Sequence, residues 1–462
     1  MLHKFVSHNN LPRLIVIYAG WGMDERPFES LRRPGYDILV VWDYRSFDID
    51  WSVAASYDEI CLIAWSMGVY AASMSSHGIE NKVTARIAVN GTMTPVDNLR
   101  GIPEAIFEGT AASLDERNLV KFYRRMCGDR ATTDAFMAVR PQRGAPELVD
   151  ELRAIWPEPV LGNPKAARWD RAIIGRRDAI FPACNQDRAW AGVPKTFVDA
   201  PHYIDLQTVI DRFIIDKQLT ETRFEAGRET YNSNATVQIA MIDHLRRLLR
   251  ATGVERKMSA DYASVAEIGC GTGLLSGYLS SLTRRGRLSL WDITSTAPDV
   301  AAEEFISCDA EIKISRTQSE RYDVIATSAT VQWFNSPGRF LRECARVLRP
   351  GGVVALTTFI KGNMYELAGI TGSSLPLLTL DDWLATLPSE FDILACEVHD
   401  YNLSFDDPMS VLRHLKFTGV NALSRSASPR PGVSRILSDY PMMLDGRYYL
   451  TYKTITMILQ LK

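Results

Sequence analysis

A serine, an acid and a histidine occur in the first half of the chain in an order that could support nucleophilic catalysis. Residues 64–68 read Ala-Trp-Ser-Met-Gly, so Ser66 is flanked by small residues, as a sharp strand-to-helix turn requires. A serine hydroxyl is a weak nucleophile unless a base takes its proton. His202 is the candidate base, and Asp178 is the candidate acid that orients it. Asp199 is a rival for the acid, although its closeness in sequence to His202 makes the orienting geometry less natural.

Three continuous apolar runs in this half predict buried parallel strands that would hold these residues. They cover residues 14–19, 38–42 and 60–65, and the third leads into Ser66 and an alanine-rich helix. This strand–turn–helix context, with the acid and then the histidine later in the chain, is typical of the α/β-hydrolase fold.

The same fold needs two N–H donors for the oxygen that becomes negative during acyl transfer. Met67 directly follows the serine, and Trp21 lies just after the first predicted strand. We therefore expect the backbone N–H groups of Trp21 and Met67 to form an oxyanion hole.

Residues 102–165 lack the alternation of strands and predict helices, for example at 115–126. In hydrolases of this fold such an insertion forms a lid. The insertion carries a local excess of basic residues, which suggests a docking face for an acidic partner, although an ordinary solvated helix face gives the same pattern. The basic residues are Arg117, Lys121, Arg124, Arg125, Arg130, Arg140 and Arg143, of which the first four are the docking candidates.

A glycine-rich loop in the second half indicates a nucleotide-like ligand. Residues 267–273 read Glu-Ile-Gly-Cys-Gly-Thr-Gly, between a predicted strand at 264–268 and a helix from Leu274. Because residue 274 is leucine, the Gly-x-Gly-x-x-Gly pattern of dinucleotide sites is not met. The loop fits S-adenosylmethionine, which has no pyrophosphate but needs close approach of the backbone. The candidate binding residues here are Glu267, Gly269, Gly271 and Gly273.

Two acids at predicted strand ends extend this site. Asp292 follows a strand at 287–291 and could bind both ribose hydroxyls, and Asp309 would lie beside the adenine. Further strands at 322–327 and 353–358, with a helix at 341–348 and a turn at 349–352 between them, complete the expected pattern. The second half therefore predicts a Rossmann-like, class I methyltransferase fold.

The bulk properties agree with two α/β domains. A chain of 462 residues exceeds one typical core, and we place a polar junction at 216–223 between domains at 1–215 and 224–462. The net charge of −3 and pI near 6.2 argue against nucleic-acid binding, and the apolar runs are too short to span a membrane. Seven scattered cysteines without a Cys-x-x-Cys pair, and no signal-peptide pattern, predict a cytoplasmic protein without a bound metal.

At this level of detail the second half resembles malonyl-acyl-carrier-protein O-methyltransferases of the BioC type, over about residues 223–462. The motifs that carry the resemblance are Arg223-Phe224, Thr230-Tyr231, Ala235, Val237-Gln238, Val331-Gln332-Trp333, Leu412-Arg413-His414-Leu415-Lys416, Thr418-Gly419-Val420-Asn421 and Leu450-Thr451-Tyr452.

The first half resembles pimeloyl-acyl-carrier-protein methyl esterases of the BioG type, over about residues 1–215. Here the motifs are Tyr18-Ala19-Gly20-Trp21-Gly22, Ala64-Trp65-Ser66-Met67-Gly68, Arg125-Met126-Cys127-Gly128 and Pro201-His202-Tyr203. The resemblances imply an enzyme of biotin synthesis that methylates malonyl-acyl-carrier protein with S-adenosylmethionine and later hydrolyses the methyl ester of pimeloyl-acyl-carrier protein. Acyl carrier protein bearing these chains is the implied partner.

The resemblance also explains why no acid–base pair is evident in the second half. A malonyl carboxylate is already an anion at neutral pH, so the domain has mainly to align it with the methyl group and exclude water. Arg413, His414 and Lys416 are candidate anchors for the carboxylate or the carrier protein, with a solvated helix face as the alternative reading. Tyr231 is a candidate for closing over the donor site.

Two other functions remain open from the sequence. One is a carboxyl methyltransferase fused to a thioesterase of another acyl pathway. The other is a chain in which one half only binds carrier protein without catalysis. The complete set of Ser66, Asp178 and His202, and the complete glycine loop, argue against the second alternative.

Overall fold

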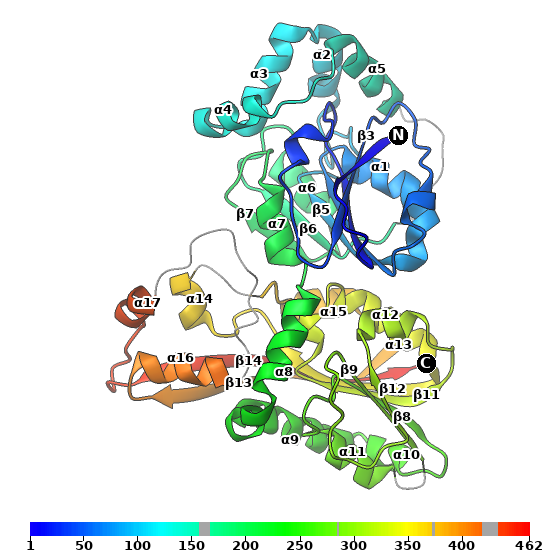
Figure 1. The fold of residues 1–462 in the computed structure, drawn as a ribbon, viewed down its shortest axis with the longest axis vertical. Coiled ribbons are helices and arrows are strands. Elements are labelled where there is room, and N and C mark those ends of the chain that lie inside the picture. Colours follow the sequence, from blue (N-terminus) through cyan, green and yellow to red (C-terminus); the bar gives the residue numbers. More distant parts are fainter. Residues whose placement is uncertain (157–166, 284–285, 372–374, 418–432) are drawn as a thin grey trace. The chain divides into compact units, whose positions relative to one another are not determined.

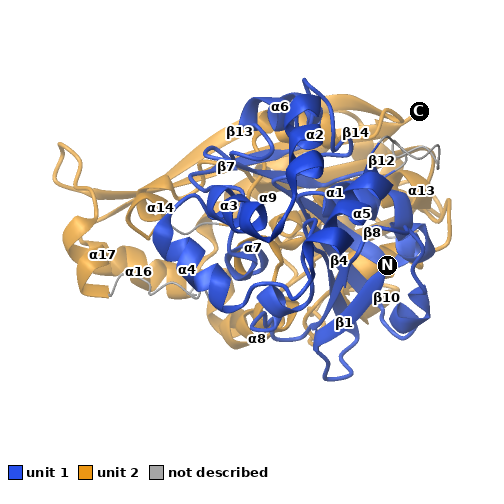
Figure 2. Cartoon of the chain, turned by 90° about the horizontal axis from the view of Figure 1, so that it is seen from above, with its two compact units in different colours: residues 1–210 blue, residues 211–462 orange. Residues whose placement is uncertain are grey.

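The computed structural model contains two compact units, residues 1–210 and 211–462, which Figure 2 shows in different colours. Each unit has one seven-stranded sheet (Figure 1). The structure describes the whole chain except residues 157–166, 284–285, 372–374 and 418–432. In the part that it describes, no helix combines the length and apolar character needed to cross a membrane.

The sheet of unit 1 has the strand order β1-β3-β2-β4-β5-β6-β7. β1 pairs antiparallel with β3, and the other neighbours are parallel. The strands predicted at 14–19, 38–42 and 60–65 are confirmed as β2, β3 and β4, which are almost wholly buried because their apolar runs face packed layers on both sides. The bounds are β1 (Leu2–Ser7), β2 (Arg13–Tyr18), β3 (Asp37–Trp42), β4 (Glu59–Trp65), β5 (Val83–Val89), β6 (Arg171–Gly175) and β7 (Lys195–Val198).

The helices of unit 1 include a group of four between β5 and β6 (Figure 1). The helix expected at 115–126 is α3, where the Asp115 side chain accepts from the N–H of Asn118 and Gly128 ends the helix at φ +79°. The helices are α1 (Gly68–Ser75), α2 (Glu104–Ser113), α3 (Glu116–Cys127), α4 (Arg130–Ala138), α5 (Ala145–Ile155), α6 (Ala183–Ala189) and α7 (Leu206–Phe213), with short 3₁₀ turns at Arg26–Phe28, Trp51–Ala54 and Ser76–Lys82.

Arg143, one of the seven basic residues in the predicted insertion, is buried and forms ion pairs within unit 1. Its guanidinium lies 2.8 Å from the carboxylate of Glu151, which is fully buried, and 3.0 Å from that of Glu147. Burial raises the pKa of Glu151, and the charge of Arg143 opposes that rise. Arg143 is therefore unavailable as a surface charge, whereas Arg117, Lys121, Arg124 and Arg125 are exposed on α3.

The sheet of unit 2 has the order β10-β9-β8-β11-β12-β14-β13. The strands from β10 to β12 are parallel, and β14 pairs antiparallel with both β12 and β13. The strands predicted at 264–268, 287–291, 322–327 and 353–358 are confirmed. The bounds are β8 (Ser264–Ile268), β9 (Arg287–Asp292), β10 (Glu304–Ser307), β11 (Tyr322–Ser328), β12 (Leu348–Phe359), β13 (Phe391–Phe405) and β14 (Tyr448–Leu461).

The helices of unit 2 show where the sequence-based boundaries were wrong. α13 begins at Pro337 rather than 341, because Ser336 caps its first turn and proline suits the first helical position. Residues 349–352, expected as a turn, lie within β12. The helices are α8 (Lys217–Asn234), α9 (Thr236–Ala251), α10 (Val254–Met258), α11 (Ser276–Leu282), α12 (Ala310–Ser315), α13 (Pro337–Val347), α14 (Tyr365–Thr371), α15 (Leu380–Thr386), α16 (Pro408–Phe417) and α17 (Val433–Asp439), with a 3₁₀ turn at Val331–Trp333.

The buried ion pairs of Arg143 lead to a stability prediction. Arg143→Leu should lower the free energy of unfolding by about 3–5 kcal/mol, because it leaves the buried carboxylate of Glu151 without its partner. Denaturant unfolding of the full chain measures this. Arg140→Leu, at an exposed position of the same segment, is the control and should change stability by less than about 0.5 kcal/mol. Equal small effects would show that the Arg143 pairs contribute little.

Candidate active sites

Ser66, His202 and Asp178 form one chain of hydrogen bonds in unit 1. The Oγ of Ser66 lies 2.9 Å from Nε2 of His202, and Nδ1 of His202 lies 2.9 Å from Oδ2 of Asp178. All three side chains are buried. In this arrangement an imidazole can take the proton of a serine hydroxyl while a carboxylate stabilises the imidazolium that forms.

The backbone at Ser66 has the sharp turn that the flanking small residues predicted. Ser66 follows β4 directly and has φ +59°, a conformation that non-glycine residues rarely adopt. Two glycines make room for the turn. A Cβ on Gly68 would lie 2.5 Å from the carbonyl oxygens of Tyr18 and Ala19, and one on Gly91 would lie 2.2 Å from that of Ser66.

Asp178 and Asp199 have different surroundings, and only Asp178 reaches the histidine. Oδ1 of Asp178 accepts from the N–H groups of Ile180 and Phe181, and Oδ2 accepts from the amide of Gln186. Asp199 is exposed and pairs instead with Arg177 at 2.7 Å. The sequence did not single out Gln186, because a glutamine eight residues after an acid carries no recognisable pattern.

Two further side chains fix the loop that carries His202, and the sequence reasoning missed both roles. The Asn90 amide, after β5, donates to the carbonyls of Pro201 and His202, and its oxygen accepts from the N–H of Gly175. The indole of Trp65 also donates to the His202 carbonyl. These bonds connect segments more than 80 residues apart, so local spacing could not reveal them.

Trp21 and Met67 line the same pocket as Ser66 and His202. Within the described residues, neither of their backbone N–H groups donates to a protein acceptor. The Trp21 indole donates to the carbonyl of Leu148 on α5, which connects this loop to the helical segment. The pocket is completed by apolar side chains from that segment, namely Ile102, Ile106, Phe107, Phe122, Met126 and Leu152.

Arg125 differs from the other docking candidates in its contacts. Its guanidinium donates twice to the carbonyl of Ala179, next to Asp178, and the side chain also lines the Ser66 pocket. Lys121 donates to Asn118 on its own helix. The four basic side chains therefore lie on the exposed face of one helix, α3. Arg125 connects this helix to the loop that contains Asp178.

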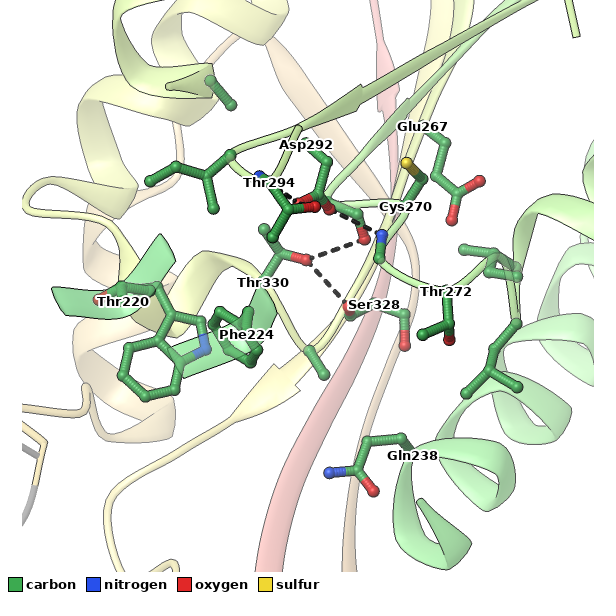
Figure 3. Close-up of a pocket in the computed structure, with 18 of the residues that line it drawn as sticks. Thr220, Phe224, Gln238, Glu267, Cys270, Thr272, Asp292, Thr294, Ser328 and Thr330 are labelled. Atoms are coloured by element: carbon green, nitrogen blue, oxygen red, sulfur yellow. Dashed lines mark hydrogen bonds between the residues drawn. The ribbon is translucent and has the colours of Figure 1, made fainter. Parts of the chain in front are cut away.

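In unit 2 the glycine loop follows β8 with three positive φ values, +75° at Gly269, +50° at Gly271 and +93° at Gly273. A Cβ on Gly269 would lie 2.0 Å from Oγ1 of Thr330, and one on Gly273 would lie 2.9 Å from Pro298. No atom lies near the Gly271 position, which lines the pocket. The loop therefore presents bare backbone to a ligand, as Figure 3 shows between Cys270 and Thr272.

Asp292 lines one side of this pocket, next to Thr294 (Figure 3). Its Oδ2 accepts from the N–H of Gly271, and its Oδ1 accepts from both the N–H and the hydroxyl of Thr294. A carboxylate has about four acceptor positions, so roughly one is left. Binding both hydroxyls of a ribose therefore requires that Asp292 exchange one protein hydrogen bond, most simply that of the Thr294 hydroxyl.

Glu267 lies beneath the loop and is buried, with Oε2 lacking a hydrogen-bond partner among the described residues. Burial raises the pKa of this carboxyl to about 8, and the nearby charge of Asp292 adds to the rise. Glu267 also lines the pocket. A positively charged ligand group beside this oxygen would favour the ionised form of the carboxyl.

Asp309 lines the pocket at the start of α12, where its side chain accepts from the N–H of Glu311. Lys217, which the sequence reasoning did not select, joins it there. The Lys217 ammonium lies 2.7 Å from Glu311 and 3.7 Å from Asp309, and it donates to the carbonyl of Trp333. The first turn of α8 is thus held at this end of the pocket by a buried lysine.

The candidates for the acceptor site fall in different places. Tyr231 lines the pocket, and burial raises the pKa of its hydroxyl to about 12. Arg413, His414 and Lys416 lie on α16 and are absent from the described lining of the pocket; His414 bonds to the Tyr452 hydroxyl at 2.8 Å. The motif at 418–421 lies outside the described residues.

A separate group of possible metal ligands lies outside both pockets. His244, Glu397 and His399 each place one ligand atom within 4.8 Å of the others. The Arg247 guanidinium donates to Nδ1 of His244 at 3.3 Å, which opposes metal binding through Nε2 because Nδ1 would then have to carry a proton. The expectation of a chain without metal stays a prediction.

Comparison with known proteins matches each half of the chain to a different family model. The family model for pimeloyl-ACP methyl esterase BioG matches residues 1–208, and that for a methyltransferase domain matches residues 266–356. A malonyl-[acyl-carrier protein] O-methyltransferase of Bacteroides fragilis is 35% identical over 96% of this chain and 92% of its own length. The chain belongs to the malonyl-[acyl-carrier protein] O-methyltransferase family, and the resemblance expected from the sequence is confirmed.

Two further relatives each match one half. A malonyl-[acyl-carrier protein] O-methyltransferase of Haemophilus influenzae is 30% identical over 53% of this chain and 94% of its own length. The crystal structure of BioG from Haemophilus influenzae is 33% identical, covers 44% of this chain and 94% of that chain, and has a TM-score of 0.40.

S-adenosylmethionine is the methyl donor of this family, and the expected cofactor is confirmed. The residues of the unit 2 pocket fit it. The bare loop at Gly269–Gly273 admits close backbone contact, Asp292 offers a carboxylate to the ribose, and the free oxygen of Glu267 suits the positively charged part of the donor.

The raised pKa of Glu267 predicts a pH-dependent stability. The folded-state pKa of about 8 exceeds the ordinary value of 4.5, so between these values the folded chain binds more protons than the unfolded chain. Stability should fall as pH rises through this window, by up to about 1.4 kcal/mol per pH unit. Glu267→Gln should therefore match the wild type at pH 5 and melt at increasingly higher temperature than it toward pH 8.

Calorimetric unfolding of the donor-free full chain at several pH values measures this difference. Glu303→Gln, at an exposed position, is the matched control and should melt in parallel with the wild type at every pH. Parallel profiles for Glu267→Gln would mean that Glu267 is ionised in the folded chain.

Proposed function

We propose that the chain is a bifunctional enzyme of biotin synthesis that forms one methyl ester and hydrolyses another. Unit 2 methylates the free carboxylate of malonyl-acyl-carrier protein, and unit 1 hydrolyses the methyl ester of pimeloyl-acyl-carrier protein. The observation that carries the esterase half is the continuous Ser66–His202–Asp178 chain of hydrogen bonds beside an apolar pocket. Membership of the malonyl-[acyl-carrier protein] O-methyltransferase family supports the other half.

For the methylation step, unit 2 has to align the acceptor and exclude water. The bound donor supplies a methyl group on a cationic sulfur. Tyr231, with its pKa raised to about 12, stays protonated and is no base, and none is required for a carboxylate acceptor. Arg228 donates to the carbonyls of Gly271 and Ala297 and thereby closes one side of the pocket.

For the hydrolysis step, we assign unit 1 an α/β-hydrolase fold in which α2–α5 form the lid. The Ser66 oxygen attacks the ester carbonyl while His202 takes the hydroxyl proton. The N–H groups of Trp21 and Met67 stabilise the oxyanion, and His202 then gives the proton to the leaving methoxide, which departs as methanol. Water, activated by His202, releases the pimeloyl chain from Ser66. Asp178, held by hydrogen bonds from two backbone N–H groups, orients the imidazole through Nδ1.

The two activities make chemical sense on one pathway. A methyl ester removes the charge of the malonyl carboxylate, so enzymes of fatty-acid synthesis can extend the methylated malonyl group as an apolar chain. Hydrolysis then restores the carboxylate. The exposed basic face of α3, defined by Arg117, Lys121, Arg124 and Arg125, would receive the acidic carrier protein on the lid itself.

Separate loss of one activity tests the bifunctional assignment. Ser66→Ala should lower hydrolysis of pimeloyl-carrier-protein methyl ester by at least about a thousandfold, because it removes the nucleophile. Methylation of malonyl-carrier protein should be unchanged, since every described residue that lines the donor pocket belongs to unit 2. Mass spectrometry of the carrier protein measures both. Ser113→Ala, at an exposed position of α2, is the control and should keep both activities. Hydrolysis by Ser66→Ala at the wild-type rate would refute the assignment.

Charge reversal tests the docking face. Lys121→Glu with Arg124→Glu should reduce kcat/KM for the carrier-protein ester by roughly tenfold at low salt, and added salt should shrink this difference. Hydrolysis of a small methyl ester should not change. Lys121 and Arg124 are both exposed. Arg125 is left unchanged because it bonds to Ala179 in the loop that contains Asp178. Arg153→Glu on α5 is the matched control. An equal loss on both substrates would show a folding defect and no docking role.

A further inference from the structure

We propose that two uncharged side chains, Gln238 and Ser328, bind the carboxylate of the methyl acceptor in the unit 2 pocket. This inference rests on the proposed methylation of a carboxylate and names the residues that recognise it. Both residues line the pocket that contains the glycine loop and Asp292.

Gln238 carries the first observation. It lies in the first turn of α9 and is 4% exposed. Among the described residues its amide has no hydrogen-bond partner, although buried amides are nearly always paired. Figure 3 shows the side chain extending from α9 into the pocket, on the opposite side from Asp292. An amide that faces a ligand pocket without a protein partner is expected to find its partner on the ligand.

Ser328 carries the second observation. It is the last residue of β11, and its Oγ is buried without a partner among the described residues. Its neighbour Thr330 donates to the Ser328 carbonyl and lies against Gly269. Ser328 is therefore next to the glycine loop, where the donor lies, and its hydroxyl can still donate to a second ligand (Figure 3).

The cations of the pocket are already engaged. Among the described lining residues these are Lys217 and Arg228. Lys217 pairs with Glu311 and bonds to the Trp333 carbonyl, and Arg228 donates to the carbonyls of Gly271 and Ala297. Since Arg413 and Lys416 are absent from this lining, uncharged donors are the groups left to meet an acceptor carboxylate.

Uncharged donors also suit the reaction better than a salt bridge. A guanidinium binds both carboxylate oxygens and neutralises the charge that makes them nucleophilic. An amide N–H and a hydroxyl can orient one oxygen and leave the other free to attack. Hydrogen bonds to a charged acceptor are stronger than those to a neutral ester, so the same two groups bind the acid more tightly than the methylated product.

Replacement of Gln238 tests the inference with a readout that does not depend on turnover. The Kd of malonyl-carrier protein is measured on full-length enzyme saturated with S-adenosylhomocysteine, together with KM and kcat for methylation. Gln238→Leu should raise Kd and KM roughly ten- to a hundredfold, as expected for the loss of one hydrogen bond to a charged group. Gln238→Glu should raise them further, because it places a negative charge against the carboxylate. The Kd of S-adenosylhomocysteine alone should stay within about twofold of that of the wild type.

Matched controls separate the possible outcomes. Gln218→Leu and Gln218→Glu, at an exposed position of α8, should leave both Kd values, KM and kcat unchanged. Where Gln238→Leu fails to fold, Ser328→Ala removes a single hydroxyl and should raise the same Kd and KM. Unchanged affinity for malonyl-carrier protein in the folded variants overturns the inference. Weakened S-adenosylhomocysteine binding by folded Gln238→Leu also overturns it, because it assigns Gln238 to the donor site. Failure of the wild type to methylate malonyl-carrier protein refutes the proposed function instead.

Discussion

Both sites depend on a backbone that leaves a buried parallel strand and turns at positive φ while passing close to neighbouring chain. In unit 1 this is the Ser66 turn after β4, where any side chain at the positions of Gly68 and Gly91 would clash with neighbouring backbone. In unit 2 it is the loop after β8, where Gly269 passes against Thr330. Such close approach is possible only where the strands on both sides are rigidly packed, which explains why β4 and β8 are buried along their whole length.

The two sites use electrostatics in opposite ways. In unit 1 a buried carboxyl group is fully hydrogen-bonded: Asp178 has partners on both oxygens, and its bond to Nδ1 fixes the orientation of His202. In unit 2 several buried polar groups lack a hydrogen-bond partner among the described residues. They are Oε2 of Glu267, Oγ of Ser328 and the amide of Gln238. The first pattern suits a site that generates its own nucleophile, and the second suits a pocket that completes its hydrogen bonds with two bound substrates.

Each site is also connected to a helical element that is distant in sequence. The Trp21 indole bonds to α5, and Arg125 of α3 bonds to Ala179 beside Asp178. Helices that line the Ser66 pocket therefore contact both the loop that contains Trp21 and the loop that contains Asp178. In unit 2 the buried Lys217 holds the first turn of α8 against Glu311 and Trp333. α8 then runs along the pocket and contributes Phe224, Arg228 and Tyr231 to its wall.

The sequence by itself determined the two turns that carry the candidate sites, because these depend on residue types at short spacing: small residues around Ser66, alternating glycines at 269–273, and an acid at the end of β9. Only the tertiary structure decided which distant groups meet. Asp178 rather than Asp199 reaches His202, Gln186 and Asn90 support them, and Arg143 is buried in the core. Contacts such as His202 with Ser66, 136 residues apart, are set by strand order in the sheet, which no local pattern encodes.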